Sequence, residues 1–197
     1  MNNTEAAWLQ KALHGDDEAF SMLVETYQKP VFNLCYRMLG DEQEAEDAAQ
    51  ESFWRAYQAL KRYDPSRSFI TWLLSIAAHY CIDQQRRRRY TSFSIDAVEE
   101  DFLPDGLPSP ENSAARGEEE QRLHSMLKEM SSQDRAAIIL RYWYDFSDQE
   151  IGAALSLSVS AVKSRLHRAR LLLAERWQAG QSEPVITERN RYGTPAF

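Results

Sequence analysis

The stretch SDQEIGAALSLSVSAVKSRLHRARLLLA, residues 147–174, is the most informative part of the chain. Ser147 followed three residues later by Glu150 is a capping box, which predicts the start of a helix. The apolar residues of that helix fall on one side at helical spacing: Ile151, Ala154 and Leu155. A Ser-rich break from Ser156 to Ser160 then ends it. The stretch therefore opens with a short amphipathic helix followed by a tight turn.

A second helix is predicted from about Ser160, with one apolar and one basic side. Its apolar residues recur at spacings of four, three and four: Val162, Leu166, Ala169 and Leu173. Its other side carries Lys163, Arg165, His167, Arg168 and Arg170. A short helix, a tight turn and a helix with a basic face form the pattern of a helix-turn-helix. Since an α-helix fits the major groove of DNA, the pattern predicts that this second helix binds DNA.

The plainer interpretation is an ordinary helical hairpin, because charged helix faces usually reflect solvation alone. The charge distribution weighs against it. The chain has a net charge of −7, yet residues 62–90 carry +4 and residues 121–180 carry +3, with −8 over residues 91–120 between them. Local basic patches, rather than net charge, set contacts to phosphate. The acidic remainder predicts weak unaided DNA binding, so a second molecule is expected to assist.

The region from Asp41 to Asp64 is predicted to form a helix with acids in its first turns and an alanine-rich inward side. Its outward side has polar and aromatic residues: Asp47, Gln50, Glu51 and Trp54. A metal site is a weak interpretation of these carboxylates, because a helical di-iron site needs Glu-x-x-His pairs and no histidine lies nearby. A solvated face and a docking face for a basic partner are the stronger alternatives.

A further helix is predicted over FITWLLSIAAHYCIDQQRRRRY, residues 69–90, and it ends in four arginines, Arg86 to Arg89. Aromatic rings beside cations suit single-stranded nucleic acid, since bases stack on the rings and cations hold phosphates. We favour nucleic-acid binding for the arginines. For Trp72 this interpretation and a core position are equally supported, whereas Tyr80 is expected in the core.

The remaining segments complete an all-α architecture of two helical domains. Residues 93–117, rich in proline and acids, are expected to be a flexible acidic linker, and residues 178–197 a disordered tail. The helix over residues 134–146 is strongly apolar; Ile138, Ile139, Tyr142 and Trp143 are expected to pack under the basic helix. We expect a cytoplasmic protein with two buried thiols, because the chain shows no secretion leader and no apolar run near the ~20 residues of a membrane span.

Three stretches together resemble the extracytoplasmic-function (ECF) sigma factors. DEQEAEDAAQESFWRAYQAL resembles the helix that docks on the clamp of RNA polymerase, SFITWLLSIAAHYCIDQQRRRR the segment that melts and reads the −10 element, and LRYWYDFSDQEIGAALSLSVSAVKSRLHRAR the region that reads the −35 element. The matching domains cover nearly all of residues 5–177. The resemblance implies a region 2 domain over residues 1–92 and a region 4 domain over residues 118–177.

Carried over residue by residue, the resemblance implies three contact sets. Core polymerase docking would use Asp47, Gln50 and Glu51, and we add Trp54 from the same outward side. Binding of −10 DNA would use Tyr63, Ser66, Arg67, Trp72 and His79, and we add Arg86, Arg87, Arg88 and Arg89 because of their charge. Binding of −35 DNA would use Ser160, Ala161, Lys163, Ser164, Arg165, His167 and Arg168. Two departures stand out: His79 where the family often has Asn, and Ser156 where the helix-turn-helix usually has Gly.

The resemblance implies a specificity subunit that catalyses no reaction, needs no cofactor or metal, and has core RNA polymerase, promoter DNA and an anti-sigma factor as partners, without membrane insertion. Two other classes remain as alternatives. A helix-turn-helix regulator that acts without polymerase would not need the helix over residues 41–61. An all-helical metalloenzyme would need a metal-binding or catalytic motif such as HExxH or CxxC, and the sequence has neither.

Overall fold

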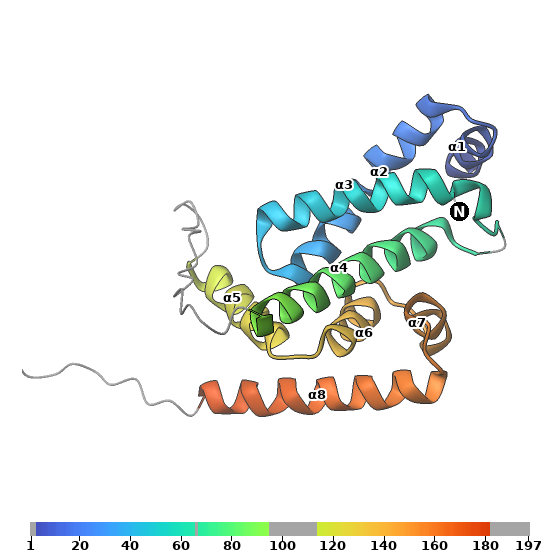
Figure 1. The fold of residues 1–197 in the computed structure, drawn as a ribbon. Helices are drawn as coiled ribbons and strands as arrows, with labels where there is room; N and C mark the ends of the chain where they lie inside the picture. Colours follow the sequence, from blue (N-terminus) through green and yellow to red (C-terminus); the bar gives the residue numbers. More distant parts are fainter. Residues whose placement is uncertain (1–2, 66, 95–113, 182–197) are drawn as a thin grey trace, which may run out of the picture.

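The computed structural model describes residues 3–65, 67–94 and 114–181, and every regular element in these ranges is a helix. The first four helices are α1 (Asn3–Leu13), α2 (Asp17–Leu39), α3 (Glu42–Ala59) and α4 (Phe69–Ser94), with a 3₁₀ turn, η1 (Leu60–Arg62), after α3. The second four are α5 (Ala114–Lys128), α6 (Ser132–Trp143), α7 (Asp148–Leu155) and α8 (Val159–Gln181). The expected all-α fold is confirmed. Figure 1 shows α4 between α3 on one side and α6 and α7 on the other.

The helix starts follow the capping residues in the sequence. Asp16 caps α2, accepting a hydrogen bond from the backbone N–H of Ala19 at 3.0 Å. Asp41 caps α3 in the same way through the N–H of Glu44 at 2.8 Å. Pro30 lies inside α2, which continues through it as one helix.

Three expected boundaries were placed differently by the structure. Helix α4 continues to Ser94 and α5 begins at Ala114, so both ends of the expected linker are helical, and residues 95–113 lie outside the described residues. Helix α8 continues to Gln181, so the first residues of the expected tail are helical too, while 182–197 lie outside the description. Just before the expected tail, Arg122 of α5 stacks on Trp177 of α8 at 4.6 Å and donates to its carbonyl at 2.7 Å.

The two halves pack against each other through α2 and α4 of the first and α5, α6 and α7 of the second. Their buried side chains form one continuous cluster. Members from both halves are fully buried, among them Val31, Leu34, Leu73, Ile138 and Leu140. Within the described ranges, no helix is long and apolar enough to cross a membrane.

Arg135 of α6 is a buried charge at this contact, with 6% of its surface exposed. Its guanidinium donates to the carbonyl of Lys128 at 2.8 Å and to the carbonyl of Met38 across the contact. Met38 lies at the C-terminal end of α2, where the helix dipole favours a cation. Gln85 of α4 donates to the same carbonyl. A buried charge is therefore paired with backbone groups of both halves.

Three further contacts join the halves. The hydroxyl of Tyr144 donates to the carbonyl of Pro30 at 2.6 Å, and burial raises the pKa of this tyrosine. The Arg37 guanidinium lies 5.0 Å from the centre of the Trp143 ring. Gly40, left-handed with φ of 85°, approaches α5 so closely that a Cβ there would lie 2.5 Å from the ring of His124. The expectation that Tyr142 and Trp143 pack under α8 was wrong: Trp143 faces α2, and Tyr142 is 58% exposed.

Candidate nucleic-acid and polymerase interfaces

The helix-turn-helix of α7 and α8 is built as its sequence predicts. The Ser147 hydroxyl accepts from the N–H of Glu150 at 3.2 Å, and the Glu150 carboxylate accepts from the N–H of Ser147 at 2.8 Å. The capping box is therefore complete. Hydrogen bonds from the Ser147 backbone and hydroxyl hold the pKa of Glu150 below its ordinary value.

The turn between the two helices depends on Ser156 and Gly152. Ser156 ends α7 in the left-handed conformation, with φ of 57° and ψ of 44°, which is uncommon for a residue with a Cβ. The N–H of Leu157 donates to the carbonyl of Gly152 at 2.8 Å. A Cβ on Gly152 would lie 2.8 Å from the carbonyl oxygen of Leu157. The close approach of the chain at Gly152 and the left-handed residue that follows α7 together set the angle between α7 and α8.

The predicted DNA-binding residues of α8 do not all share one environment. Lys163, Ser164, His167 and Arg168 are exposed, as is Ser160, and Ala161 is half-buried. Arg165 differs, because only 22% of its side chain is exposed and it faces α6. Val162, Leu166 and Ala169 are buried beneath, as their spacing predicts.

Asp134 of α6 holds two arginines of α8. Its Oδ1 accepts from Arg165 at 2.9 Å and from Arg168 at 3.2 Å. Burial by itself would raise the pKa of Asp134, but hydrogen bonds from Arg165, Ser131 and Arg168 outweigh it and the pKa lies below its ordinary value. Asp134 is therefore an anion at neutral pH. Nothing in the spacing of α6 links Asp134 to α8, so this contact could not be predicted from the sequence.

The predicted polymerase-docking residues share one outward face of α3. Asp47 and Gln50 are exposed, and Glu51 accepts from Arg55 at 2.8 Å while remaining 37% exposed. Trp54 is 56% exposed, and its ring stacks on Tyr57 at 6.1 Å. The structure thus brings carboxylates and an exposed aromatic pair together on one surface. Large exposed aromatic residues of this kind are typical of protein contact sites.

The predicted −10 residues fall into two groups. The first lies around the start of α4. Tyr63 is 5% exposed, donates to the carbonyl of Arg67, and has its ring centre 5.1 Å from that of Trp72. Trp72 is half-buried and Arg67 is exposed, while Ser66 lies outside the described residues. Trp72 therefore packs partly against the core and remains partly accessible.

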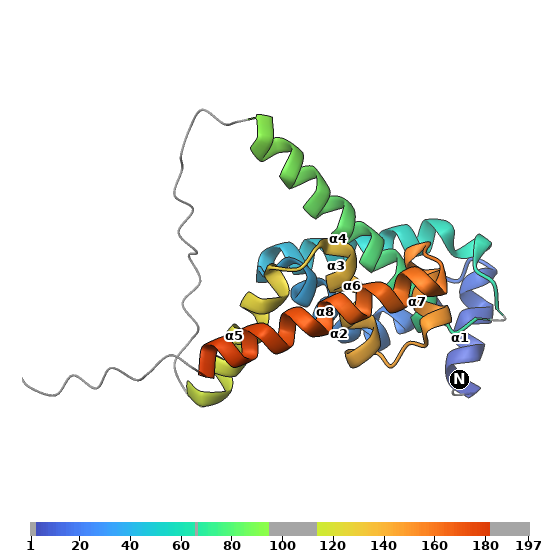
Figure 2. The ribbon, with the colours of Figure 1, turned by 90° about the horizontal axis from the view of Figure 1, so that it is seen from below.

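The second group lies further along α4, toward its C-terminus. His79 is exposed, two turns beyond Trp72, and Arg86 follows after two further turns. Arg87 and Arg88 are also exposed; Arg86 pairs with Asp83 at 3.1 Å and Arg88 pairs with Glu44 of α3. The side chain of Arg89 lies outside the description. Figure 2 shows this end of α4 extending away from the other helices.

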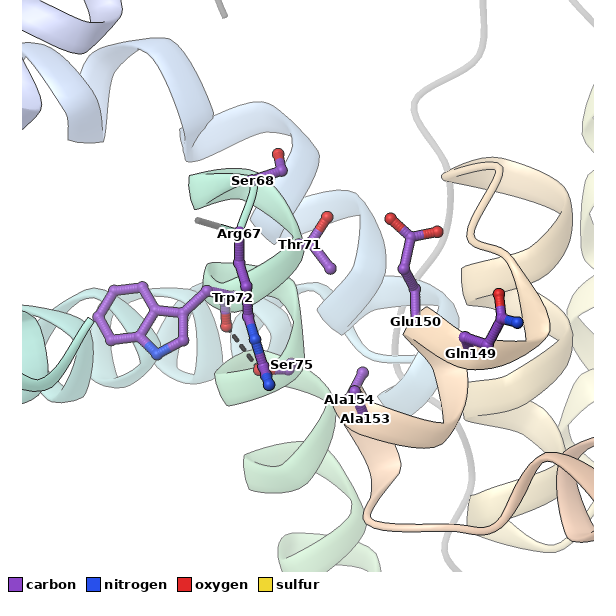
Figure 3. Close-up of a pocket in the computed structure, with 9 residues that line it drawn as sticks. All are labelled: Arg67, Ser68, Thr71, Trp72, Ser75, Gln149, Glu150, Ala153 and Ala154. Carbon is purple, nitrogen blue, oxygen red and sulfur yellow. Dashed lines mark hydrogen bonds between the residues drawn. The ribbon is translucent and has the colours of Figure 1, made fainter. Parts of the chain in front are cut away.

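A cavity of about 360 Å³ lies between the start of α4 and α7, which pack on each other beside it. Figure 3 shows the lining residues of α4 and its preceding loop on one side and those of α7 on the other. They are Arg67, Ser68, Thr71, Trp72, Ser75, Gln149, Glu150, Ala153 and Ala154. The first helix of the helix-turn-helix therefore faces the predicted −10 residues directly.

Within the described residues, no group of three His, Cys, Asp or Glu side chains could hold a metal ion, and Cys35 and Cys81 are buried thiols.

Comparison with known families matches the two halves of the chain to two separate families. Residues 23–91 match Sigma-70 region 2, and residues 120–173 match Sigma-70, region 4. The first match runs from α2 to α4. The second runs from α5 into α8 and includes the helix-turn-helix.

Similar proteins extend the match over most of the chain. The ECF RNA polymerase sigma factor SigW of Bacillus subtilis is 34% identical over 170 residues, which cover 82% of this chain and 90% of SigW. The ECF RNA polymerase sigma-E factor of Escherichia coli is 33% identical over 178 residues, covering 85% and 91% of the two chains. Among solved structures, CnrH in complex with the cytosolic domain of CnrY is 26% identical with a TM-score of 0.66, over 90% of this chain and 99% of that one.

A second solved structure, the sigma factor RpoE of Bartonella quintana in complex with the anti-sigma factor NepR, supports the fold alone. It is 21% identical with a TM-score of 0.65, over 81% of this chain and 96% of that chain. The two family matches, in order and on the helices that carry the predicted contact surfaces, agree with the relatives above 30% identity. This chain belongs to the ECF sigma factors of RNA polymerase, which are not enzymes but direct transcription initiation.

Proposed function

We propose that the exposed side of α8 reads the −35 element, that the exposed face of α4 reads and opens the −10 element, and that the outward face of α3 docks on core RNA polymerase. The observation that carries this proposal is the division of α8 into a buried apolar side and an exposed side with Lys163, His167 and Arg168. Contacts to phosphate would position the helix, and contacts to base edges would specify the sequence.

The half-buried Trp72 and exposed His79 support the −10 assignment. Opening a duplex costs a few kcal/mol per extruded base, which contacts to the unpaired strand must offset. An aromatic ring with one accessible part can stack on a base, and the arginines beyond it can hold the backbone. Trp72, His79 and the arginines therefore supply both kinds of contact along α4.

Reading both elements requires the two domains to separate. The difference between −10 and −35 puts the two elements about 25 base pairs apart, which is about 85 Å of duplex at 3.4 Å per base pair. Here α7 packs on α4, so the two reading surfaces are much closer than that. The segment 95–113 between α4 and α5 is acidic and, fully extended, spans about 65 Å. We infer that it acts as the linker, with a region 2 domain over residues 1–92 and a region 4 domain over residues 118–177, and that binding to polymerase opens the packed arrangement.

A protein inhibitor is a further expected partner. CnrH, the solved neighbour at 26% identity, is held in a complex with the cytosolic domain of CnrY. An anti-sigma factor that binds this chain in its packed form would keep the −10 and −35 surfaces from reaching a promoter together. We also expect a cytoplasmic location, because the proposed function requires contact with RNA polymerase.

Run-off transcription with purified core polymerase and a randomised promoter library tests the proposal. We expect transcripts only when the chain is present, from templates that share a −35 and a −10 sequence. Initiation without preference for either element would contradict the assignment of the reading surfaces. The docking surface is tested by Asp47→Ala, with Glu42→Ala as a matched control, because Glu42 is an exposed acid on another side of α3. Only Asp47→Ala should weaken core binding.

A further inference from the structure

Asp134 is the point where the support helix α6 holds the recognition helix α8 by charge. One carboxylate oxygen of Asp134 accepts from both Arg165 and Arg168, which are three residues apart and therefore neighbours on one flank of α8. Only 14% of the Asp134 side chain is exposed. Partial burial makes these charge-assisted hydrogen bonds stronger than those of a surface pair.

The two arginines use this contact differently. Arg165 is 22% exposed and lies between α6 and α8, so its ion pair with Asp134 joins the two helices. Arg168 is 56% exposed and lies at the edge of the DNA-facing side, so its guanidinium can reach a base while one nitrogen stays on Asp134. A guanidinium has five N–H donors, which allows both contacts at once.

We propose that Asp134 is a positioning residue for −35 recognition, holding the Arg168 guanidinium in a fixed orientation so that it contacts a base edge rather than a phosphate. The inference rests on the proposed function of α8. Bidentate contact with a base requires a defined orientation of the guanidinium, whereas a phosphate attracts it from many directions. The Asp134 anion also repels the DNA backbone. It therefore raises sequence specificity at the expense of non-specific affinity.

The test uses the full chain assembled with core polymerase and the substitution Asp134→Asn, which keeps the shape and removes the charge. Binding is measured to the promoter selected by the wild-type protein and to the unselected library. We expect the ratio of the two affinities to fall about tenfold, within the range supplied by one base contact. Binding to the library should become tighter. The slope of log affinity against log salt should steepen by about one, because the freed Arg168 moves to a phosphate.

Three variants separate positioning from a structural role. Asp134→Glu should restore most of the specificity, because it keeps the anion. Asp134→Asn combined with Arg168→Ala should match Arg168→Ala alone, since Asp134 acts through that arginine. Glu129→Gln is the matched control: it removes one charge from the same domain and frees Arg176, which pairs with it at 2.6 Å two turns further along α8. It should leave the affinity ratio unchanged.

Two results would overturn the proposal. One is an unchanged affinity ratio in Asp134→Asn. The other is a uniform loss of affinity for every template with no change in salt slope, which would make Asp134 a purely structural contact. Failure of the proposed function is distinct, because then the wild-type protein itself would select no −35 sequence from the library.

Discussion

Replacing Ser156 with glycine is expected to stabilise the protein. Ser156 ends α7 with φ of 57°. For a residue with a Cβ, this left-handed conformation is less favourable by about 1–2 kcal/mol. Glycine avoids this cost but loses about 0.5–1 kcal/mol more backbone entropy on folding. The difference favours Ser156→Gly by about 0.5–1 kcal/mol in the free energy of unfolding. The melting temperature should rise by about 1–4 °C for a protein of this size.

The structure offers controls in both directions. Asp145 is also left-handed, with φ of 55°, but aspartate tolerates this conformation better than serine does. Asp145→Gly should therefore gain less than Ser156→Gly. Gly152→Ala should be destabilising, because its new Cβ would meet the carbonyl oxygen of Leu157 at 2.8 Å and the backbone of the turn would have to move.

Thermal and urea unfolding of the full chain measure these differences, and promoter selection with core polymerase checks that the turn is unchanged. Ser156→Gly should keep the promoter preference of the wild-type protein, because it adds no atom at the surface of α8. Two results would contradict this expectation: destabilisation by Ser156→Gly, or a larger gain in stability from Asp145→Gly than from Ser156→Gly. Either result would mean that Ser156 is not held in a strained conformation.

Further predictions concern docking, DNA affinity and acid stability. Glu51→Ala, like Asp47→Ala, should weaken core binding in a pull-down while changing the free energy of unfolding by less than about 0.5 kcal/mol, because both residues are on the surface. Lys163→Ala should weaken binding to all promoters alike and make the salt slope shallower by about one, if this exposed lysine contacts a phosphate. The pKa of Glu150 is lowered in the folded state by hydrogen bonds from the backbone and hydroxyl of Ser147. Its contribution to the free energy of unfolding is therefore present above the unfolded pKa and is lost as the pH falls through the folded pKa. Melting temperatures between pH 7 and pH 3 should therefore fall less steeply for Glu150→Gln than for the wild-type protein.

Local chemistry explains why the helices and their caps could be predicted from the sequence. Capping by Asp41 and Ser147 depends on residues three positions apart, and the buried side of α8 depends on a spacing of three and four. Such interactions are complete within one or two turns of the chain. The resemblance marked Ser156 as a departure from the usual glycine at this position, and the structure shows it in the left-handed conformation.

The Asp134 contact could not be predicted in this way, because it joins residues 31 and 34 positions apart on two helices. Its partners were visible in the sequence as basic residues of the recognition helix. Their pairing depends on the crossing of α6 and α8, which no spacing within either helix records. The consequence is functional: two arginines predicted as equivalent DNA contacts differ in exposure, 22% against 56%.

The packing of the two domains involves α6, whose apolar residues were expected to pack under α8. The middle of this helix is covered all round, because residues 135–140 are all buried and all but Arg135 are apolar. A helix of that kind must be covered on more than one side. Helix α8 covers one side, while α2 and α4 cover another. The contacts that fix the second side reach backbone carbonyls, as Arg135 does at Met38 and Tyr144 does at Pro30. Every residue has a carbonyl, so such contacts leave no pattern in the partner sequence. The buried residues of α6 therefore need a cover beyond α8, and only the structure identifies α2 and α4 as that cover.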